Sequence, residues 1–170
     1  MKRIMQFFRA VRLVSKYGEK RILKDTLTGC YARLLLEEIA EREINMAERY
    51  KHKLCLIIAD VDGLKKINDE NGHLAGDNAL KKIAQVLKEV ARKTDLIFRW
   101  GGDEFIVIMS NTDKLGSQRF IREASKELDK FSLNISMGYV FWEKGLNLDD
   151  LIYTADLKLL EKKKIKKAQI

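Results

Sequence analysis

The sequence predicts a mixed α/β domain of the α+β type, with a β-α-β-β-α-β core and a central antiparallel sheet. The continuous apolar run 54–59 has the composition of a strand buried on both faces. Two further apolar segments flank a glycine pair at 101–102 and form a predicted hairpin. Apolar residues at helical spacing lie between these strands and a last alternating strand. This order is typical of the ferredoxin-like or polymerase-palm arrangement.

Length and composition fit one globular domain. The chain has 170 residues, of which 46% are apolar and 34% are charged. Cys30 and Cys55 stand in unrelated contexts, which predicts neither a disulfide framework nor a zinc site and fits a reducing compartment. No apolar stretch approaches the roughly 18 residues of a membrane span, and Arg9 and Arg12 interrupt the N-terminal apolar residues. We therefore expect a cytoplasmic protein with no membrane span.

The net charge of +8 is concentrated at the two ends of the chain. Residues 1–24 contain eight Lys or Arg and one Glu, and residues 158–167 contain six Lys and one Glu. The middle of the chain is left acidic, with a net charge of −4. A basic protein suggests a nucleic-acid partner, but an acidic centre repels phosphate unless a cation intervenes. A metal site is the simpler inference, and no nucleic-acid partner is expected.

Residues 1–24 form the first predicted unit, a basic amphipathic helix or linker. Its apolar residues recur at helical spacing: Ile4, Phe7, Val11 and Val14. Gly18 ends this pattern after two heptads at most, so a long coiled coil is not predicted. Three roles fit the pattern: a helix for packing or dimer contact, a helix that binds a membrane surface or a partner, and a solvated tail.

Residues 25–170 form the second predicted unit, in which helices and strands follow one another. A turn at 25–29 leads into a helix that extends to about Tyr50. The buried strand comes next and ends in Asp60-Val61-Asp62. The elements expected after it are a polar helix and loop at 64–73, a helix from about 75 to 90, the hairpin strands 96–100 and 105–109, a helix around 120–128, a strand at 133–141 and a last helix from about 151.

The predicted core brings carboxylates together at one edge of the sheet. The first core strand and the hairpin lie side by side in this arrangement, which places Asp60 near Asp103 and Glu104. Gly101 and Gly102 carry no Cβ and so let a ligand approach the backbone. Three carboxylates suit two Mg²⁺ ions, which can promote an in-line displacement at phosphorus. The spacing therefore predicts a nucleotidyl-transfer enzyme, and the alternative is a palm-like fold with a solvated acidic edge.

Several motifs in order resemble the GGDEF-domain diguanylate cyclases over about residues 25–167. The matching segments are DTLTG at 25–29, DVDGLKKIND at 60–69, NGHLAGD at 71–77 and GGDEF at 101–105. The resemblance implies an enzyme that condenses two GTP molecules into cyclic di-GMP and releases two pyrophosphates. It also implies a homodimer in which each protomer binds one GTP, and two Mg²⁺ ions per active site, for which Mn²⁺ can substitute.

The resemblance assigns roles to individual residues. The implied metal ligands are Asp60, the Val61 carbonyl, Asp103 and Glu104. Asp103 and Glu104 are also the implied catalytic pair, with Asp103 as the base for the ribose 3′-hydroxyl. The implied nucleotide contacts are Asn68 and Asp77 at the guanine edge, Lys65, Lys163 and Lys167 at the triphosphate, Gly101 and Gly102 at the turn, and His73, which also fits a structural loop position.

Arg92 and Asp95 fit the RxxD product-binding motif of the same family. Asp95 is separated from the glycine pair by five residues, which is the offset of the family motif. A guanidinium can bind phosphate through two hydrogen bonds or stack on guanine. The resemblance therefore implies allosteric inhibition by the product at this site. In isolation the motif also fits a solvated helix end.

The chain departs from the family pattern at a few positions. It has Leu160 where the family usually has Tyr, Lys166-Lys167 in place of Gly-Arg, Ala32 in place of Asn and Leu64 in place of Phe. None of these changes removes an implied metal ligand. Two other functions stay open: a catalytically weak receptor for GTP or cyclic di-GMP, and a ferredoxin-like RNA-binding module. Family members commonly respond to an upstream sensor, so a sensor or partner protein is also expected.

Overall fold

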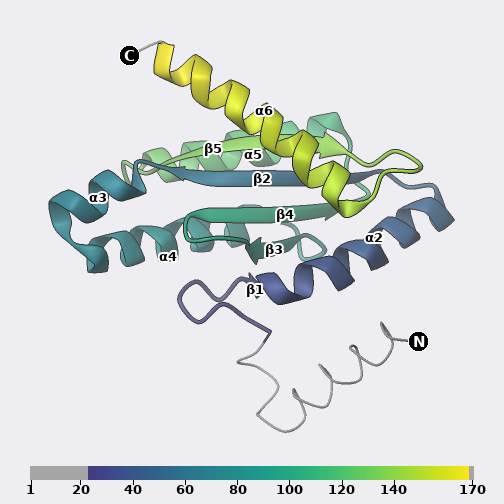
Figure 1. Ribbon diagram of the computed structural model, residues 1–170, viewed down its shortest axis with the longest axis horizontal. Helices are drawn as coiled ribbons and strands as arrows, with labels where there is room; N and C mark the ends of the chain where they lie inside the picture. Colours follow the sequence, from purple (N-terminus) through teal and green to yellow (C-terminus); the bar gives the residue numbers. More distant parts are fainter. Residues whose placement is uncertain (1–22, 169–170) are drawn as a thin grey trace, which may run out of the picture.

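The computed structural model describes residues 23–168, apart from the side chain of Lys167, and centres on a five-stranded sheet (Figure 1). The predicted unit at 1–24 therefore lies almost entirely outside the described residues. The elements in chain order are β1 (Tyr31–Ala32), the 3₁₀ helix η1 (Arg33–Leu35), α2 (Leu36–Tyr50), β2 (Leu54–Asp62), α3 (Leu64–Asn71), α4 (His73–Val90), β3 (Leu96–Arg99), β4 (Glu104–Ser110), α5 (Lys114–Asp129), β5 (Asn134–Phe141) and α6 (Leu148–Ala168).

The strand order is β1-β3-β4-β2-β5, which confirms the predicted core. β2 pairs antiparallel with β4 on one side and with β5 on the other. β3 and β4 form the predicted hairpin. β1 adds a short parallel strand beside β3 that the sequence did not predict. Two residues are too few to show the alternation that marks a strand.

Both faces of the sheet are covered, which explains why β2 is apolar without alternation. Cys55, Ile57 and Ala59 face a core that also contains buried residues of α4 and α5. Leu56 and Ile58 face a second core that contains buried residues of α2 and α6. Asp60 continues the second series, because side chains two residues apart on a strand share a face. Asp60 therefore lies on the α6 side of the sheet.

Gly138 on β5 allows α6 to lie directly on the sheet. A Cβ at this position would lie 2.2 Å from the carbonyl oxygen of Ala155 and 2.5 Å from the backbone nitrogen of Leu159. Only glycine permits so close an approach of helix backbone to strand backbone. α6 then extends towards the end of the sheet where α3 begins and where β3 turns into β4 (Figure 1). The close crossing thus directs the later residues of α6 to the predicted carboxylate edge.

The connection between α3 and α4 is tighter than expected. α4 begins at His73, about two residues before the predicted start, and Gly72 joins the two helices with a positive φ of 82°. Left-handed backbone of this kind favours glycine.

Among residues 23–168, no helix is long and apolar enough to span a membrane.

Candidate active site

The end of β2 and the hairpin turn lie side by side, as the topology requires. Asp60 on β2 is directly opposite Glu104 on β4. The Val61 backbone N–H donates to the Asp103 carbonyl oxygen at 3.0 Å, which ties the turn to the strand. Residues directly opposite one another on antiparallel strands have neighbouring side chains on the same face. The structure therefore brings Asp60 and Glu104 together, with Asp103 in the adjoining turn.

Gly101 and Gly102 serve different purposes in the turn. A Cβ at Gly101 would lie 2.6 Å from Oε2 of Glu104, so the Glu104 carboxylate folds back over this residue. A Cβ at Gly102 would meet no atom of the described residues within 4 Å, and Gly102 is exposed. A side chain at Gly101 would therefore displace the Glu104 carboxylate, whereas the space beside Gly102 is open to a ligand.

The carboxylate edge holds more negative charge than its surroundings neutralise. Burial raises the pKa of Asp60, the hydrogen bond and charge of Lys163 oppose that rise, and the charge of Asp103 adds to it. Burial also raises the pKa of Glu104, and the charges of Asp60 and Asp103 raise it further. Nζ of Lys163 lies 2.5 Å from Oδ1 of Asp60. An ion pair thus partly balances the edge, and a further cation would be favoured there.

The types of donor at this edge fit a hard divalent cation, because Mg²⁺ prefers carboxylate and carbonyl oxygens. Within residues 23–168, however, no group of three or more His, Cys, Asp or Glu side chains is arranged to hold a metal ion. Lys163 occupies an oxygen of Asp60 instead. Asp60, Asp103 and Glu104 supply the oxygen donors at this edge, and the ion pair with Lys163 uses one of them.

The predicted guanine contacts lie where α3 meets α4. Asn68 projects towards α4, and its buried Oδ1 has no hydrogen-bond partner among the described residues. A Cβ at Gly76 would lie 1.9 Å from this oxygen. Gly76 therefore makes the space for Asn68, a role that the sequence motif alone did not indicate. Asp77 is the next residue on α4, so both predicted contacts lie in one corner of the fold.

The remaining predicted nucleotide contacts are more exposed. Lys65 lies on α3 and His73 is the first residue of α4, and both are exposed to solvent. Lys163 is on α6 and contacts Asp60 rather than open solvent. Lys167 belongs to α6, but its side chain is outside the described residues. The structure thus gathers Lys163 with the carboxylates and leaves Lys65 and His73 at the surface.

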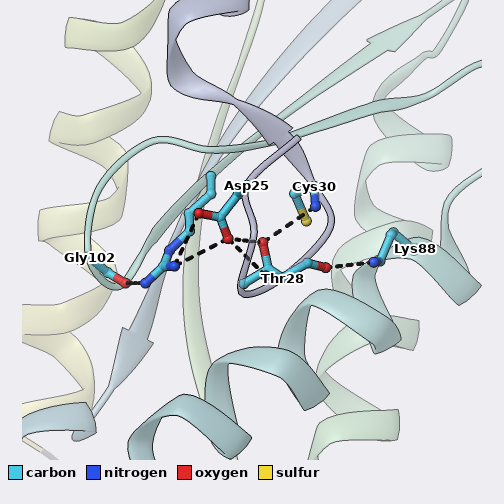
Figure 2. Close-up of polar contacts among 6 residues, drawn as sticks. Asp25, Thr28, Cys30, Lys88 and Gly102 are labelled. Atoms are coloured by element: carbon cyan, nitrogen blue, oxygen red, sulfur yellow. Dashed lines mark hydrogen bonds and ion pairs between the residues drawn. The ribbon is translucent and has the colours of Figure 1, made fainter. Parts of the chain in front are cut away.

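Arg99 connects this turn to residues 25–29, and no sequence motif indicated this role. Its guanidinium donates to Asp25 at 3.2 and 3.3 Å and to the Gly102 carbonyl at 2.7 Å (Figure 2). Asp25 also accepts hydrogen bonds from the backbone and hydroxyl of Thr28. Burial alone would raise the pKa of Asp25, but these hydrogen bonds and Arg99 outweigh it and lower the pKa. Arg99 therefore fixes the shape of the turn at Gly102.

Lys88 holds the same 25–29 turn from α4. Its Nζ donates to the Thr28 carbonyl at 2.8 Å (Figure 2). The turn that opens the described domain is therefore fixed both to the hairpin and to α4. Arg99 links residues 25–29 directly to Gly102.

Arg92 and Asp95 form a closed turn between α4 and β3. The Arg92 backbone N–H donates to Oδ2 of Asp95 at 2.8 Å, and the Asp95 N–H donates to the Arg92 carbonyl at 3.0 Å. Asp95 is only 8% exposed, and burial raises its pKa against the opposing contributions of Arg92. Asp95 therefore is not part of a solvated helix end. Both residues line a hollow of about 160 Å³ that also borders Arg119 and Glu123 of α5.

The structure is a palm-like α/β domain with an acidic turn beside its central strands β4 and β2. The chain matches the profile of the family described as "Diguanylate cyclase, GGDEF domain" over residues 22–169. The match covers most of the chain, and the protein belongs to the GGDEF-domain family.

Named relatives agree with this assignment. The chain is 32% identical to diguanylate cyclase DosC of Escherichia coli over 154 residues, which cover 85% of this chain and 34% of DosC. The chain thus spans about a third of that relative. It is also similar to the crystal structure of diguanylate cyclase SiaD in complex with its activator SiaC from Pseudomonas aeruginosa, with a TM-score of 0.81 and 27% identity over 96% of this chain and 65% of that chain.

A second solved structure is similar over the domain itself. The GGDEF domain of DgcB from Caulobacter crescentus, in complex with c-di-GMP, has a TM-score of 0.80 and 25% sequence identity. The similarity covers 84% of this chain and 88% of that chain. The resemblance inferred from the motifs and the predicted fold are both confirmed.

Proposed function

We propose that residues 25–170 are the catalytic domain of a cytoplasmic diguanylate cyclase that condenses two GTP molecules into cyclic di-GMP. The observation that carries the proposal is the carboxylate edge, where Asp60 and Glu104 face each other across adjacent strands beside Asp103. The family membership and the cyclase relatives support the same reaction. RNA binding is disfavoured, because carboxylates lie where such modules present aromatic side chains.

The nucleotide would lie between this edge and the α3–α4 corner. Asn68 offers a buried oxygen that has no partner within residues 23–168, and Asp77 on α4 can accept hydrogen bonds from the N1–H and amino group of guanine. Lys163 would exchange its contact with Asp60 for the triphosphate. Lys65, Lys167 and His73 complete the proposed contacts. The open space at Gly102 lets the nucleotide approach the backbone.

Asp60, the Val61 carbonyl, Asp103 and Glu104 would hold two Mg²⁺ ions, for which Mn²⁺ can substitute. These ions would supply charge stabilisation at the phosphate. The 3′-oxygen of one GTP forms a bond to the α-phosphorus of the other, and the bond to the pyrophosphate oxygen breaks. Asp103 accepts the proton of that hydroxyl. A second, equivalent attack closes the ring, so two pyrophosphates leave for each product molecule.

One active site holds one GTP in this proposal, so catalysis requires a homodimer with two facing half-sites.

We also propose that cyclic di-GMP inhibits the enzyme by binding at Arg92 and Asp95. The hollow beside these residues lies between the α4–β3 turn and α5, and its lining includes no residue of the carboxylate edge. Product bound there would therefore not compete with GTP. A sensor or partner protein would set the activity, as the activator complex of SiaD illustrates for that relative.

The direct test is to incubate the purified chain with GTP and Mg²⁺ and identify the products by chromatography and mass spectrometry. We expect cyclic di-GMP and pyrophosphate in a ratio of one to two, and no product when EDTA is present. Binding of GTP or cyclic di-GMP without turnover would support the weak-receptor alternative instead. Because isolated domains of regulated enzymes can be inactive, the assay is repeated over a range of protein concentrations that favours the dimer.

A further inference from the structure

Two lysines on α6 contact two aspartates on β2. Lys163 pairs with Asp60 at 2.5 Å, and Lys166 pairs with Asp62 at 2.8 Å. The lysines are three residues apart on a helix and the aspartates two residues apart on a strand, so each pair lies on one face of its element. The two ion pairs together fasten the last turns of α6 to the end of β2.

The Lys166 ammonium has a complete set of partners. Besides Asp62, it donates to the Ser136 hydroxyl at 3.2 Å and to the Ile135 carbonyl at 3.3 Å. An ammonium has three N–H donors, so these contacts match its capacity. Ser136 is only 2% exposed and donates to both oxygens of Asp62, at 2.8 and 3.0 Å. The Asp62 carboxylate is therefore fixed from the sheet before Lys166 reaches it.

Lys163 is in a different situation. Its partner Asp60 is a proposed metal ligand, and a cation bound by Asp60 would compete with the Lys163 ammonium for the carboxylate. Metal binding would therefore break the pair that holds α6 at residue 163. Asp62 lies outside the proposed metal-ligand set, so the Lys166 pair can persist.

Apolar packing does not replace the lost pair. The fully buried residues described on α6 are Leu151, Ala155 and Leu159. Beyond them, Leu160 and Ile165 are 46% and 59% exposed. The last turns of α6 thus depend on polar contacts with β2 and β5 to stay in place.

We propose that Lys166 is a positioning residue, held by Asp62 and Ser136. It keeps the end of α6 against the sheet while Lys163 moves from Asp60 to the nucleotide triphosphate. The inference rests on the proposed function, because it assumes a nucleotide at the carboxylate edge. In this proposal Lys166 keeps its three protein acceptors and makes no direct contact with phosphate.

The test uses the full chain and a non-cleavable GTP analogue with a methylene group between the α- and β-phosphorus, titrated calorimetrically in Mg²⁺. Lys166→Met removes the anchor. Lys164→Met is the matched control, because Lys164 is exposed on the same helix and loses the same charge. We expect Lys166→Met to weaken analogue binding about fivefold, as the loss of a partly exposed ion pair predicts. Lys164→Met should stay within about twofold.

Further variants separate positioning from direct phosphate contact. If Lys166 acts through Asp62, then Asp62→Asn weakens binding like Lys166→Met, and the double variant is no weaker than either single variant. Lys166→Arg should restore most of the affinity. In the turnover assay the loss should appear in KM for GTP, with kcat at saturating GTP changed less than about twofold.

Two results would overturn the inference while leaving the proposed function intact. One is analogue binding by Lys166→Met that equals that of Lys164→Met. The other is normal or tighter binding by Asp62→Asn together with weak binding by Lys166→Met, which would make Lys166 a phosphate ligand. If the unaltered chain binds neither GTP nor the analogue, the proposed function itself fails, and the inference fails with it.

Discussion

The carboxylate edge and the Arg92–Asp95 corner contain the same types of residue but hold them in opposite ways. At the edge, Asp60, Glu104 and Lys163 come from three elements that are distant in the sequence. At the corner, Asp95 is fixed by the backbone of a residue only three positions earlier. Long-range charge contacts can be exchanged for a ligand without unfolding a turn. A carboxylate that closes its own turn cannot be released so easily.

We therefore expect substitutions at the edge to affect catalytic activity and substitutions of Asp95 to affect the stability of the fold. Substitution of Glu104 at the edge should remove chemistry and leave the fold intact, because like charges gather around this side chain. Substitutions of Asp95 should instead affect folding, since a buried acceptor of a backbone N–H is lost. Arg92 contributes its guanidinium to the surface and its backbone to the turn, so its side chain can be removed without opening the turn.

The largest expected effect is at the edge. Glu104→Gln should lower the rate of cyclic di-GMP formation by more than about 100-fold, because a neutral amide is a poor ligand for Mg²⁺ and charge stabilisation by the metal is lost. Glu127→Gln, on the exposed surface of α5, is the matched control and should keep the parental rate. Thermal unfolding of Glu104→Gln should show an intact domain. Near-parental product formation by Glu104→Gln would rule out the proposed metal set.

The second prediction concerns stability at the corner. Asp95→Ala should lower the free energy of unfolding by about 1–3 kcal/mol, because it leaves the Arg92 N–H without its acceptor. Arg92→Ala keeps that N–H and should change stability by about 0.5 kcal/mol or less. Urea unfolding followed by circular dichroism measures both. Equal losses in the two variants would show that the Arg92 side chain, rather than the turn, supports the corner.

The third prediction concerns product inhibition at the corner. Arg92→Ala should weaken cyclic di-GMP binding about tenfold, through the loss of charge-assisted hydrogen bonds to the phosphate. The initial rate at low product should match that of the parent. Initial rates are measured over a matrix of GTP and cyclic di-GMP concentrations. We expect non-competitive inhibition of the parent and little inhibition of the variant, and simple competition with GTP in the parent would contradict a separate product site.

The contrast also explains what could be predicted from sequence. The strand at 54–62, the hairpin and the α5–β5 order were predictable because burial imposes periodicity on residues that are close in sequence. The proximity of Asp60 and Glu104 followed from topology once that order was known. Three features had no such signal: the short β1, the Arg99 bridge to Asp25, and the space that Gly76 leaves for Asn68. Each depends on contacts between distant segments or on the absence of a single methyl group.

The smallest expected effect concerns stability, and it tests whether charge repulsion at the carboxylate edge destabilises the folded protein. The pKa of Glu104 is raised in the folded protein, by burial first and by neighbouring carboxylates next. A carboxyl whose folded pKa lies above its unfolded value, about 4.3 for Glu, binds more protons when folded in the pH range between the two. Stability without metal therefore falls as the pH rises through that range and stays lowered above it.

Glu104→Gln removes this titration and should show a higher melting temperature than the parent at pH 7 in EDTA. The difference should shrink as the pH falls towards 4, where the parental Glu104 becomes protonated and resembles the neutral amide. The Asp95 corner keeps its own raised pKa in both proteins, so it cancels from the comparison. Addition of Mg²⁺ at pH 7 should stabilise the parent more than the variant, since only the parent retains the full carboxylate set. If the variant instead melts below the parent at pH 7 in EDTA, Glu104 supports the fold. The proposed difference between the carboxylate edge and the Arg92–Asp95 corner would then be wrong.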